Sequence, residues 1–192
     1  MDPGHTYADY LRREEESDVR HEYFDGRTFA LAGGSLAHAE LGARLARMLG
    51  NLLAPRGCRV YSSDLRVHVR ETGLSTYPDV SVVCGRPATA DHDPRALINP
   101  TLLVEVLSPS TEAYDRGEKF EHYQRLDSLQ GLLLVATDRV VIELRQREDD
   151  RWTIRLFGAG ASVPLEGGEA LSIDEVYAGV ELDPRRWPTP RA

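Results

Sequence analysis

The sequence predicts an α/β (α+β) domain in which helices flank a mixed β-sheet. Residues 101–107 are nearly continuous apolar residues, as in a central strand buried on both faces. A helical pattern over 114–126 and a second apolar run over 131–137 follow. A strand–helix–strand crossover of this length makes parallel neighbours. Hairpin patterns over 21–31 and 140–157 add antiparallel strands, so the predicted sheet is mixed.

Length and composition limit the organisation of the chain. It has 192 residues, is 41% hydrophobic and has a formal net charge of −8. We expect one domain over residues 1–183 and a tail over 184–192. No apolar run is long enough to predict a membrane-spanning helix. The negative charge argues against a broad nucleic-acid-binding surface but allows a local one.

The two cysteines, Cys58 and Cys84, lie in apolar surroundings without close histidine or cysteine neighbours. This pattern favours buried thiols in a reducing, cytoplasmic protein over a disulfide or a zinc site.

Local signals predict the remaining elements. Residues 7–16 form an amphipathic helix with Thr6 as its N-cap. The Asp25-Gly26 pair marks the turn of the first hairpin, because it adopts the positive backbone angles that a two-residue turn requires. Residues 35–53 begin with a capping serine and continue with leucines at helical spacing, which predicts a long helix.

Local patterns in the rest of the chain predict short strands, one loop and one short helix. We predict one half-buried strand over 60–69, a second strand over 79–83, a polar loop over 86–99 and a short helix over 173–177.

Lysine occurs once, at position 119, whereas arginine supplies the other 22 of the 23 basic residues. The two are not interchangeable, because an ammonium is a compact point charge and a guanidinium is a planar fork. Lys119 is therefore a candidate for chemistry. Two alternatives do not require a chemical role. The chain could retain one lysine by chance, or Lys119 could form a surface i,i+4 ion pair with Asp115 that contributes a few tenths of a kcal/mol to stability.

Two carboxylates precede this lysine. Asp79 begins its strand, and Glu105 interrupts the apolar strand over 101–107, where a buried carboxylate is costly unless something pairs or coordinates it. Neighbouring strands about 4.8 Å apart would bring the two acids together. Oxygen-only ligation then selects Mg²⁺ or Mn²⁺. Alternatively, Asp79 caps a turn, and Glu105 is neutral or paired with an arginine.

The order acid-strand, acid-strand, lysine resembles the PD-(D/E)XK nuclease superfamily, and within it the chain closely resembles the restriction endonuclease family called Uma-two over residues 7–182. The segments that carry the resemblance are Glu22 with Asp25-Gly26, His38, residues 63–67, Pro78-Asp79-Val80, residues 105–111, and Asp115 with Lys119 and Tyr123. The resemblance implies a restriction-endonuclease-like mixed sheet flanked by helices, and Mg²⁺-dependent (or Mn²⁺-dependent) endonuclease activity on DNA.

The resemblance also implies roles for individual residues. Asp79, Glu105 and the backbone carbonyl of Val106 would be metal ligands. The superfamily lysine normally lies two residues after the second acid, which here is Leu107, but the family pattern places it on the next helix, at Lys119.

Two further site residues follow from the resemblance. Glu22 would be an additional acid near the metal, or else a hairpin residue paired with Arg20 or Arg27. His38 would point into the cleft from the first turn of its helix, although a lone helical histidine is more often structural. One departure stands out: family members usually carry Glu-Tyr where this chain has Gly131-Leu132.

The sequence thus predicts a metal-dependent DNA endonuclease that works as a homodimer, because cutting two strands needs two sites related by a twofold axis. The alternative is a nuclease-fold binding or assembly module without cleavage, which the acidic charge and Gly131-Leu132 would favour. RNA, or single-stranded or structured DNA, is a third possibility, because phosphate chemistry is common to all of these polymers.

Overall fold

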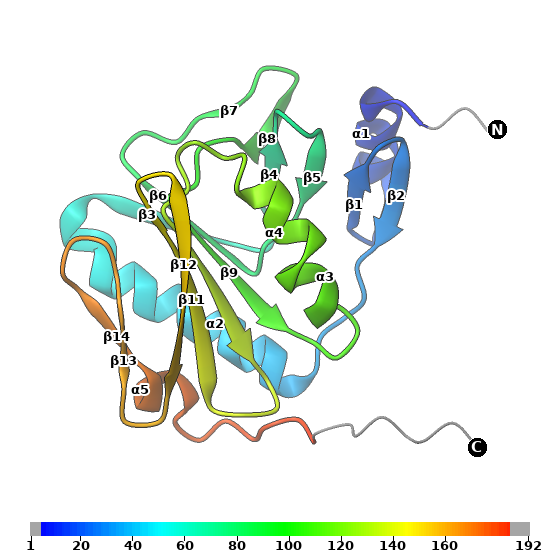
Figure 1. Cartoon of the computed structure of the whole chain (residues 1–192). Helices are drawn as coiled ribbons and strands as arrows, with labels where there is room; N and C mark the ends of the chain where they lie inside the picture. The colour runs from blue at the N-terminus through cyan, green and yellow to red at the C-terminus, as the bar shows by residue number, and fades with distance from the viewer. Residues whose placement is uncertain (1–4, 185–192) are drawn as a thin grey trace.

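The computed structural model describes residues 5–184, which form two six-stranded sheets, a two-stranded ribbon and five α-helices (Figure 1). The central sheet has the order β12-β11-β10-β9-β6-β3. Its strands are β3 (Cys58–Ser62), β6 (Val80–Cys84), β9 (Leu102–Leu107), β10 (Gly131–Ala136), β11 (Val141–Glu148) and β12 (Arg151–Gly158). β9 and β10 pair in parallel and the other neighbours are antiparallel, so the predicted mixed sheet is confirmed.

The second sheet carries the N-terminal part of the chain. Its order is β2-β1-β5-β4-β8-β7, and α1 (Tyr7–Glu16) lies beside its β1–β2 end (Figure 1). The strands are β1 (His21–Phe24), β2 (Arg27–Ala30), β4 (Arg66–Val69), β5 (Leu74–Thr76), β7 (Thr89–Ala90) and β8 (Asp93–Leu97). The predicted cap at Thr6 and the turn at Asp25-Gly26 are confirmed, with φ of 45° and 73° at the two turn residues.

Helices cover both faces of the central sheet. α2 (Leu36–Leu53) and α5 (Ile173–Tyr177) pack on one face, against side chains that include Val104, Val106, Leu133 and Val135. α3 (Glu112–Arg116) and α4 (Glu118–Tyr123) lie over the other face, where Leu103, Leu107, Leu132 and Leu134 pack with Phe120. Because strand side chains alternate between faces, Glu105 belongs to the α4 face.

Two strand predictions were wrong. Residues 60–69 are not one strand: a turn in which Leu65 N–H donates to Ser62 O separates β3 from β4, and these belong to different sheets. The predicted loop over 86–99 contains β7 and β8, and β8 pairs in parallel with β4. The parallel pairing of β4 with β8 joins segments that are far apart in the chain, and local alternation gave no sign of it.

The predicted helix over 114–126 is two short helices. Gly117 has φ −107° and ψ −103°, which is not helical, and it separates α3 from α4. A Cβ at this position would lie 3.1 Å from Ala113 O, so the tight junction favours glycine.

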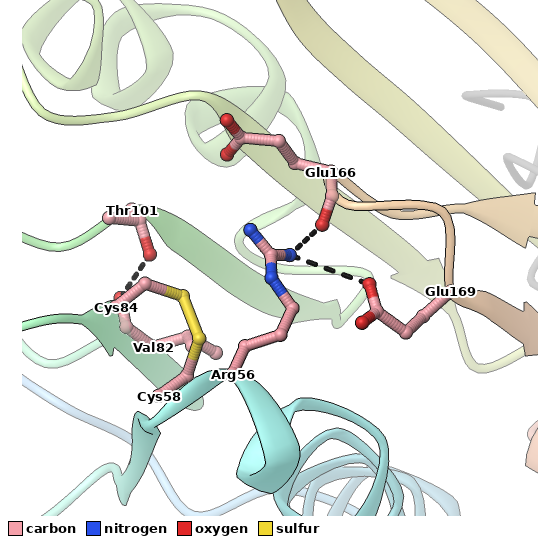
Figure 2. The surroundings of a disulfide bond; sticks show 7 residues. All are labelled: Arg56, Cys58, Val82, Cys84, Thr101, Glu166 and Glu169. Atoms are coloured by element: carbon pink, nitrogen blue, oxygen red, sulfur yellow. Dashed lines mark hydrogen bonds and ion pairs between the residues drawn. A yellow bond between two sulfur atoms is a disulfide. The ribbon is translucent and has the colours of Figure 1, made fainter.

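The free-thiol prediction was also wrong. Cys58 and Cys84 face each other in the β3–β6 register and form a disulfide (Figure 2). Their separation of 26 residues gave no local sign of this pairing. Arg56, next to the disulfide, donates to Glu166 O in the segment that joins β13 (Ser162–Pro164) to β14 (Ala170–Ser172).

No helix among residues 5–184 is long and apolar enough to cross a membrane. Apart from Pro184, the predicted tail lies outside the described residues.

Candidate active site

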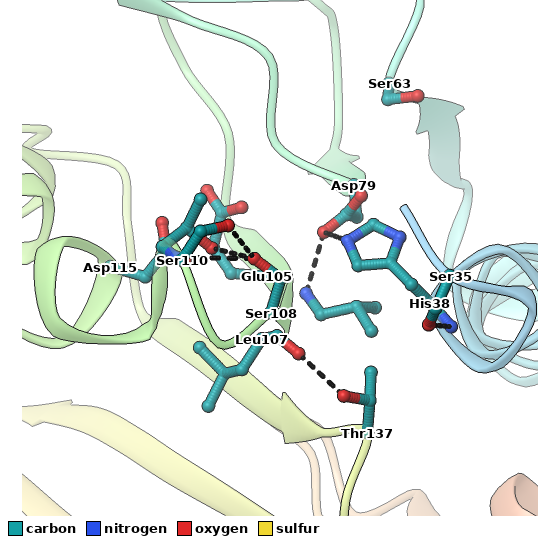
Figure 3. Close-up of polar contacts among 12 residues, drawn as sticks. Ser35, His38, Ser63, Asp79, Glu105, Leu107, Ser108, Ser110, Asp115 and Thr137 are labelled. Carbon is teal, nitrogen blue, oxygen red and sulfur yellow. Dashed lines mark hydrogen bonds and ion pairs between the residues drawn. The ribbon is translucent and has the colours of Figure 1, made fainter. Parts of the chain in front are cut away.

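The two acids meet at one end of the β6–β9 pair. Val80 lies opposite Val104 in this antiparallel ladder, so the next pair along the same register is Asp79 and Glu105. Asp79 Oδ2 accepts the backbone N–H of Val106 at 2.7 Å, which fixes the aspartate against β9. In Figure 3 the acids lie between the helix that carries His38 and the helix that carries Asp115. The structure therefore brings the predicted pair together.

Glu105 is 4% exposed and is held by donors from α4. Its Oε1 accepts the Tyr123 hydroxyl at 2.5 Å and lies 3.0 Å from Lys119 Nζ. The partner is thus the only lysine of the chain and not one of its arginines.

Lys119 lies among three carboxylates. Its Nζ is 3.0 Å from Glu105 Oε1, 3.0 Å from Glu22 Oε1 and 3.4 Å from Asp115 Oδ1. Lys119 and Asp115 are each 4% exposed. The i,i+4 pair is therefore buried and is not a surface pair.

Glu22 reaches this cluster from β1. It is 5% exposed, and its Oε1 also accepts the Thr76 hydroxyl. Arg20, a partner considered from sequence, instead forms an ion pair with the exposed Asp64. Thr76 was missed by sequence reasoning, since nothing in its local pattern links it to residue 22.

His38 lies in the first turn of α2, with Nε2 3.6 Å from Asp79 Oδ2 (Figure 3). Gly34 packs against the imidazole: a Cβ there would lie 2.6 Å from the ring. Ser35 caps the helix through the N–H of His38 and donates to Asp183 Oδ2 at 2.7 Å. The histidine thus points toward Asp79, and the absence of a side chain at Gly34 leaves space for its ring.

The site holds more negative charge than its cations balance. Burial raises the pKa of Glu105 to about 8; Lys119 opposes this shift, and Asp115 and Asp79 reinforce it. Burial also raises the pKa of Asp79, against the effects of His38 and the Val106 N–H. For Lys119, burial lowers the pKa, but the attraction of Glu105 and the neighbouring groups outweighs it, so the pKa lies well above its usual value and the ammonium stays charged.

The donor chemistry suits a hard divalent cation, because carboxylate and carbonyl oxygens are the ligands that Mg²⁺ and Mn²⁺ prefer. Within residues 5–184, no three His, Cys, Asp or Glu side chains are grouped as ligands of one ion. The predicted set needs only two such side chains, Asp79 and Glu105, and the Val106 carbonyl. Together with the surplus of buried carboxylate charge, this set fits the ion.

The departure at Gly131-Leu132 lies away from this cluster. In the parallel β9–β10 ladder, Gly131 lies opposite Leu102 and Leu134 lies opposite Glu105. The glycine is therefore three positions along β10 from the residue that pairs with Glu105. A Cβ on Gly131 would lie 3.0 Å from Leu102 Cδ1. The position therefore belongs to the packing at the other end of β9.

Comparison with known proteins agrees with this architecture. A family model described as "Putative restriction endonuclease", Uma2, matches residues 7–185. An uncharacterized protein of Synechocystis sp. is 39% identical over 186 residues, covering 93% of this chain and 94% of that protein. A second from the same organism is 34% identical over 160 residues, covering 82% and 90%.

A solved structure shares the fold. The crystal structure of a "putative nuclease belonging to DUF820" from Anabaena variabilis superimposes with a TM-score of 0.69 at 20% identity, covering 84% of this chain and 92% of that one. This match shows that the two proteins share one mixed α+β fold.

Proposed function

Because the chain belongs to the Uma2 family, whose model matches residues 7–185, we propose that it is a Mg²⁺- or Mn²⁺-dependent endonuclease that hydrolyses phosphodiester bonds of DNA. One observation carries the proposal: the only lysine of the chain is buried among Glu22, Glu105 and Asp115, and the register of β6 with β9 places Asp79 opposite Glu105. Burying an ammonium and several carboxylates costs folding free energy, and such buried charged clusters are typical of functional sites.

Asp79, Glu105 and the Val106 carbonyl would hold the cation. When bound, the cation would neutralise phosphodiester charge and activate water for attack on phosphorus. The N–H of Val106 fixes Asp79 for this task, and His38 Nε2 approaches the same Asp79 oxygen and would orient it.

Lys119 would stabilise the negative charge that develops on the phosphoryl oxygens, because it is charged and positioned before the reaction begins. Glu22 would share the ammonium with Glu105 and keep it near the reacting group. Cutting both strands would require a homodimer with two such sites, which we propose for the active form.

The proposal is tested with metal-free full-length protein and plasmid DNA, with Mg²⁺ or Mn²⁺ added. We expect cleavage that falls at least about a hundredfold in Asp79→Ala and in Glu105→Gln, as when a charge-stabilising group is lost. The matched control is Glu71→Gln, which changes an acid whose side chain is 62% exposed and should leave cleavage unchanged.

Undiminished cleavage by Asp79→Ala would remove that residue from the mechanism. If wild type neither cleaves nor binds the cations, the alternative of a binding or assembly module takes precedence. RNA and single-stranded DNA assayed in parallel identify the polymer that is cut.

A further inference from the structure

Tyr123 is a buried tyrosine whose hydroxyl is directed at the proposed metal site. It is 0% exposed, and its ring packs in the α4-face core with residues such as Leu103 and Leu107. The hydroxyl donates to Glu105 Oε1 at 2.5 Å, and within residues 5–184 it has no other hydrogen-bond partner. A phenylalanine would fill the same space, so packing alone does not explain the hydroxyl.

The two donors that hold Glu105 both bind the same oxygen. Tyr123 and Lys119 contact Oε1, whereas no hydrogen bond from residues 5–184 reaches Oε2. An ionised carboxylate has about four lone-pair positions on its two oxygens. Holding one oxygen from two sides fixes the rotation of the group and leaves the other oxygen available to a ligand.

The two donors are not equivalent. The Lys119 ammonium is on a flexible stem and also contacts Glu22 and Asp115, so its position depends on three carboxylates. The Tyr123 ring is fixed by the core around it and contacts one carboxylate. Tyr123 is therefore the donor that can define the orientation of Glu105.

We propose that Tyr123 is a positioning residue: by holding Glu105 Oε1 it presents Oε2 to the divalent cation. This inference rests on the proposed function, because it assumes that Glu105 is a metal ligand. Partners that hydrogen-bond to a ligand fix its direction, and losing one typically weakens metal binding about 10- to 100-fold.

The test compares Tyr123→Phe with wild type in the full chain, after removal of metal with EDTA. We expect calorimetric titration with Mg²⁺ to give a Kd at least about tenfold weaker in the variant. DNA cleavage should then require more Mg²⁺ and recover toward the wild-type rate at saturation.

The control is Tyr177→Phe. Its hydroxyl is likewise buried, but it donates to Ala136 O and Val141 O, each at 2.8 Å, on the α5 side of the sheet. Both variants lose a buried hydrogen bond, so thermal melting should shift in both, whereas only Tyr123→Phe should change the Mg²⁺ affinity. If Tyr123→Phe does not fold, Tyr123→Met replaces it with the same expectation, because methionine adapts to irregular core space.

The outcomes separate the two proposals. If wild type binds Mg²⁺, Asp79→Ala does not, and Tyr123→Phe binds as tightly as wild type, the role of Tyr123 is overturned and the metal site stands. If wild type binds no Mg²⁺ with or without DNA present, the proposed function and this inference are both overturned.

Discussion

Replacing Lys119 by methionine tests how tightly the acidic cluster depends on its one ammonium. The side chain is 6% exposed, and its Nζ lies 3.0, 3.0 and 3.4 Å from three carboxylate oxygens. Methionine keeps most of the volume but removes the charge. Removing one partner of a buried ion pair costs about 3–5 kcal/mol, because the remaining charges stay buried without compensation.

The cost appears directly in the melting temperature of the metal-free protein. For a chain of this size, a loss of about 3–5 kcal/mol lowers Tm by roughly 6–20 °C. Glu105, whose pKa burial raises to about 8, is largely protonated at pH 6 and adds little uncompensated charge there, whereas at pH 8 its ionised fraction does. The variant should therefore lose more stability at pH 8 than at pH 6.

The control is Arg125→Met. Arg125 pairs with Glu71 at 3.5 Å, but the two side chains are 59% and 62% exposed, so this pair contributes only about 0–1 kcal/mol. Calorimetric melting of both variants in EDTA makes the comparison. Our account of the cluster is refuted if Lys119→Met melts no lower than Arg125→Met, or if its deficit does not change between pH 6 and pH 8.

Three other predictions concern the rest of the fold and the pH response. Asp93→Asn should lower the free energy of unfolding by about 3–5 kcal/mol, because it breaks a buried bidentate pair with Arg66 at 2.8 and 3.0 Å; a loss below 1 kcal/mol in urea unfolding would contradict this. Cys58→Ser should lose about 3–4 kcal/mol, as expected for a disulfide that spans 26 residues, and a reductant should destabilise wild type but not the variant. Finally, the Glu105 contribution to the stability of the metal-free protein should fall as pH rises from about 5 to 8, at a slope of up to about 1.4 kcal/mol per unit, because the folded pKa of Glu105 is about 8 and its ordinary value is 4.5. This contribution is fully present below the unfolded pKa and is lost as pH rises through the folded pKa. Urea unfolding in EDTA that gives wild type and Glu105→Gln the same pH dependence across this range would argue against it.

The sequence predicted what depends on local chemistry. Capping at Thr6 and Ser35 and the Asp25-Gly26 turn all involve residues within a few positions of each other. The parallel pairing of β9 with β10 followed from the length of the crossover, a rule that needs no knowledge of side-chain contacts.

Several contacts between strands that are far apart in the chain were not predicted from the sequence. The pairing of β8 with β4 and the contact of Thr76 with Glu22 both join segments that are far apart in the chain. The Cys58–Cys84 disulfide depends on the β3–β6 register, which only the assembled sheet defines. Single-sequence patterns carry no information on such register.

In the candidate site, too, some residues were predicted from local sequence and others were not. Glu105 was identified because a carboxylate within an apolar strand conflicts with its surroundings, and Asp79 because it begins the strand expected beside it. Asp115 could have been added, since it lies one helical turn before Lys119. The metal ligation and catalytic roles of these residues remain predictions.

The break at Gly117 explains how a lysine on a helix reaches Glu105 on β9. In the superfamily that the sequence resembles, the lysine would be expected at Leu107, on the same face of β9 as Glu105. Here Leu107 is 3% exposed and packs in the α4-face core, so that strand position serves the fold. Because the chain is redirected at Gly117, α4 lies over β9 and brings Lys119 Nζ to 3.0 Å from Glu105. An ammonium therefore lies beside Glu105, and a helix residue supplies it instead of the strand position at Leu107.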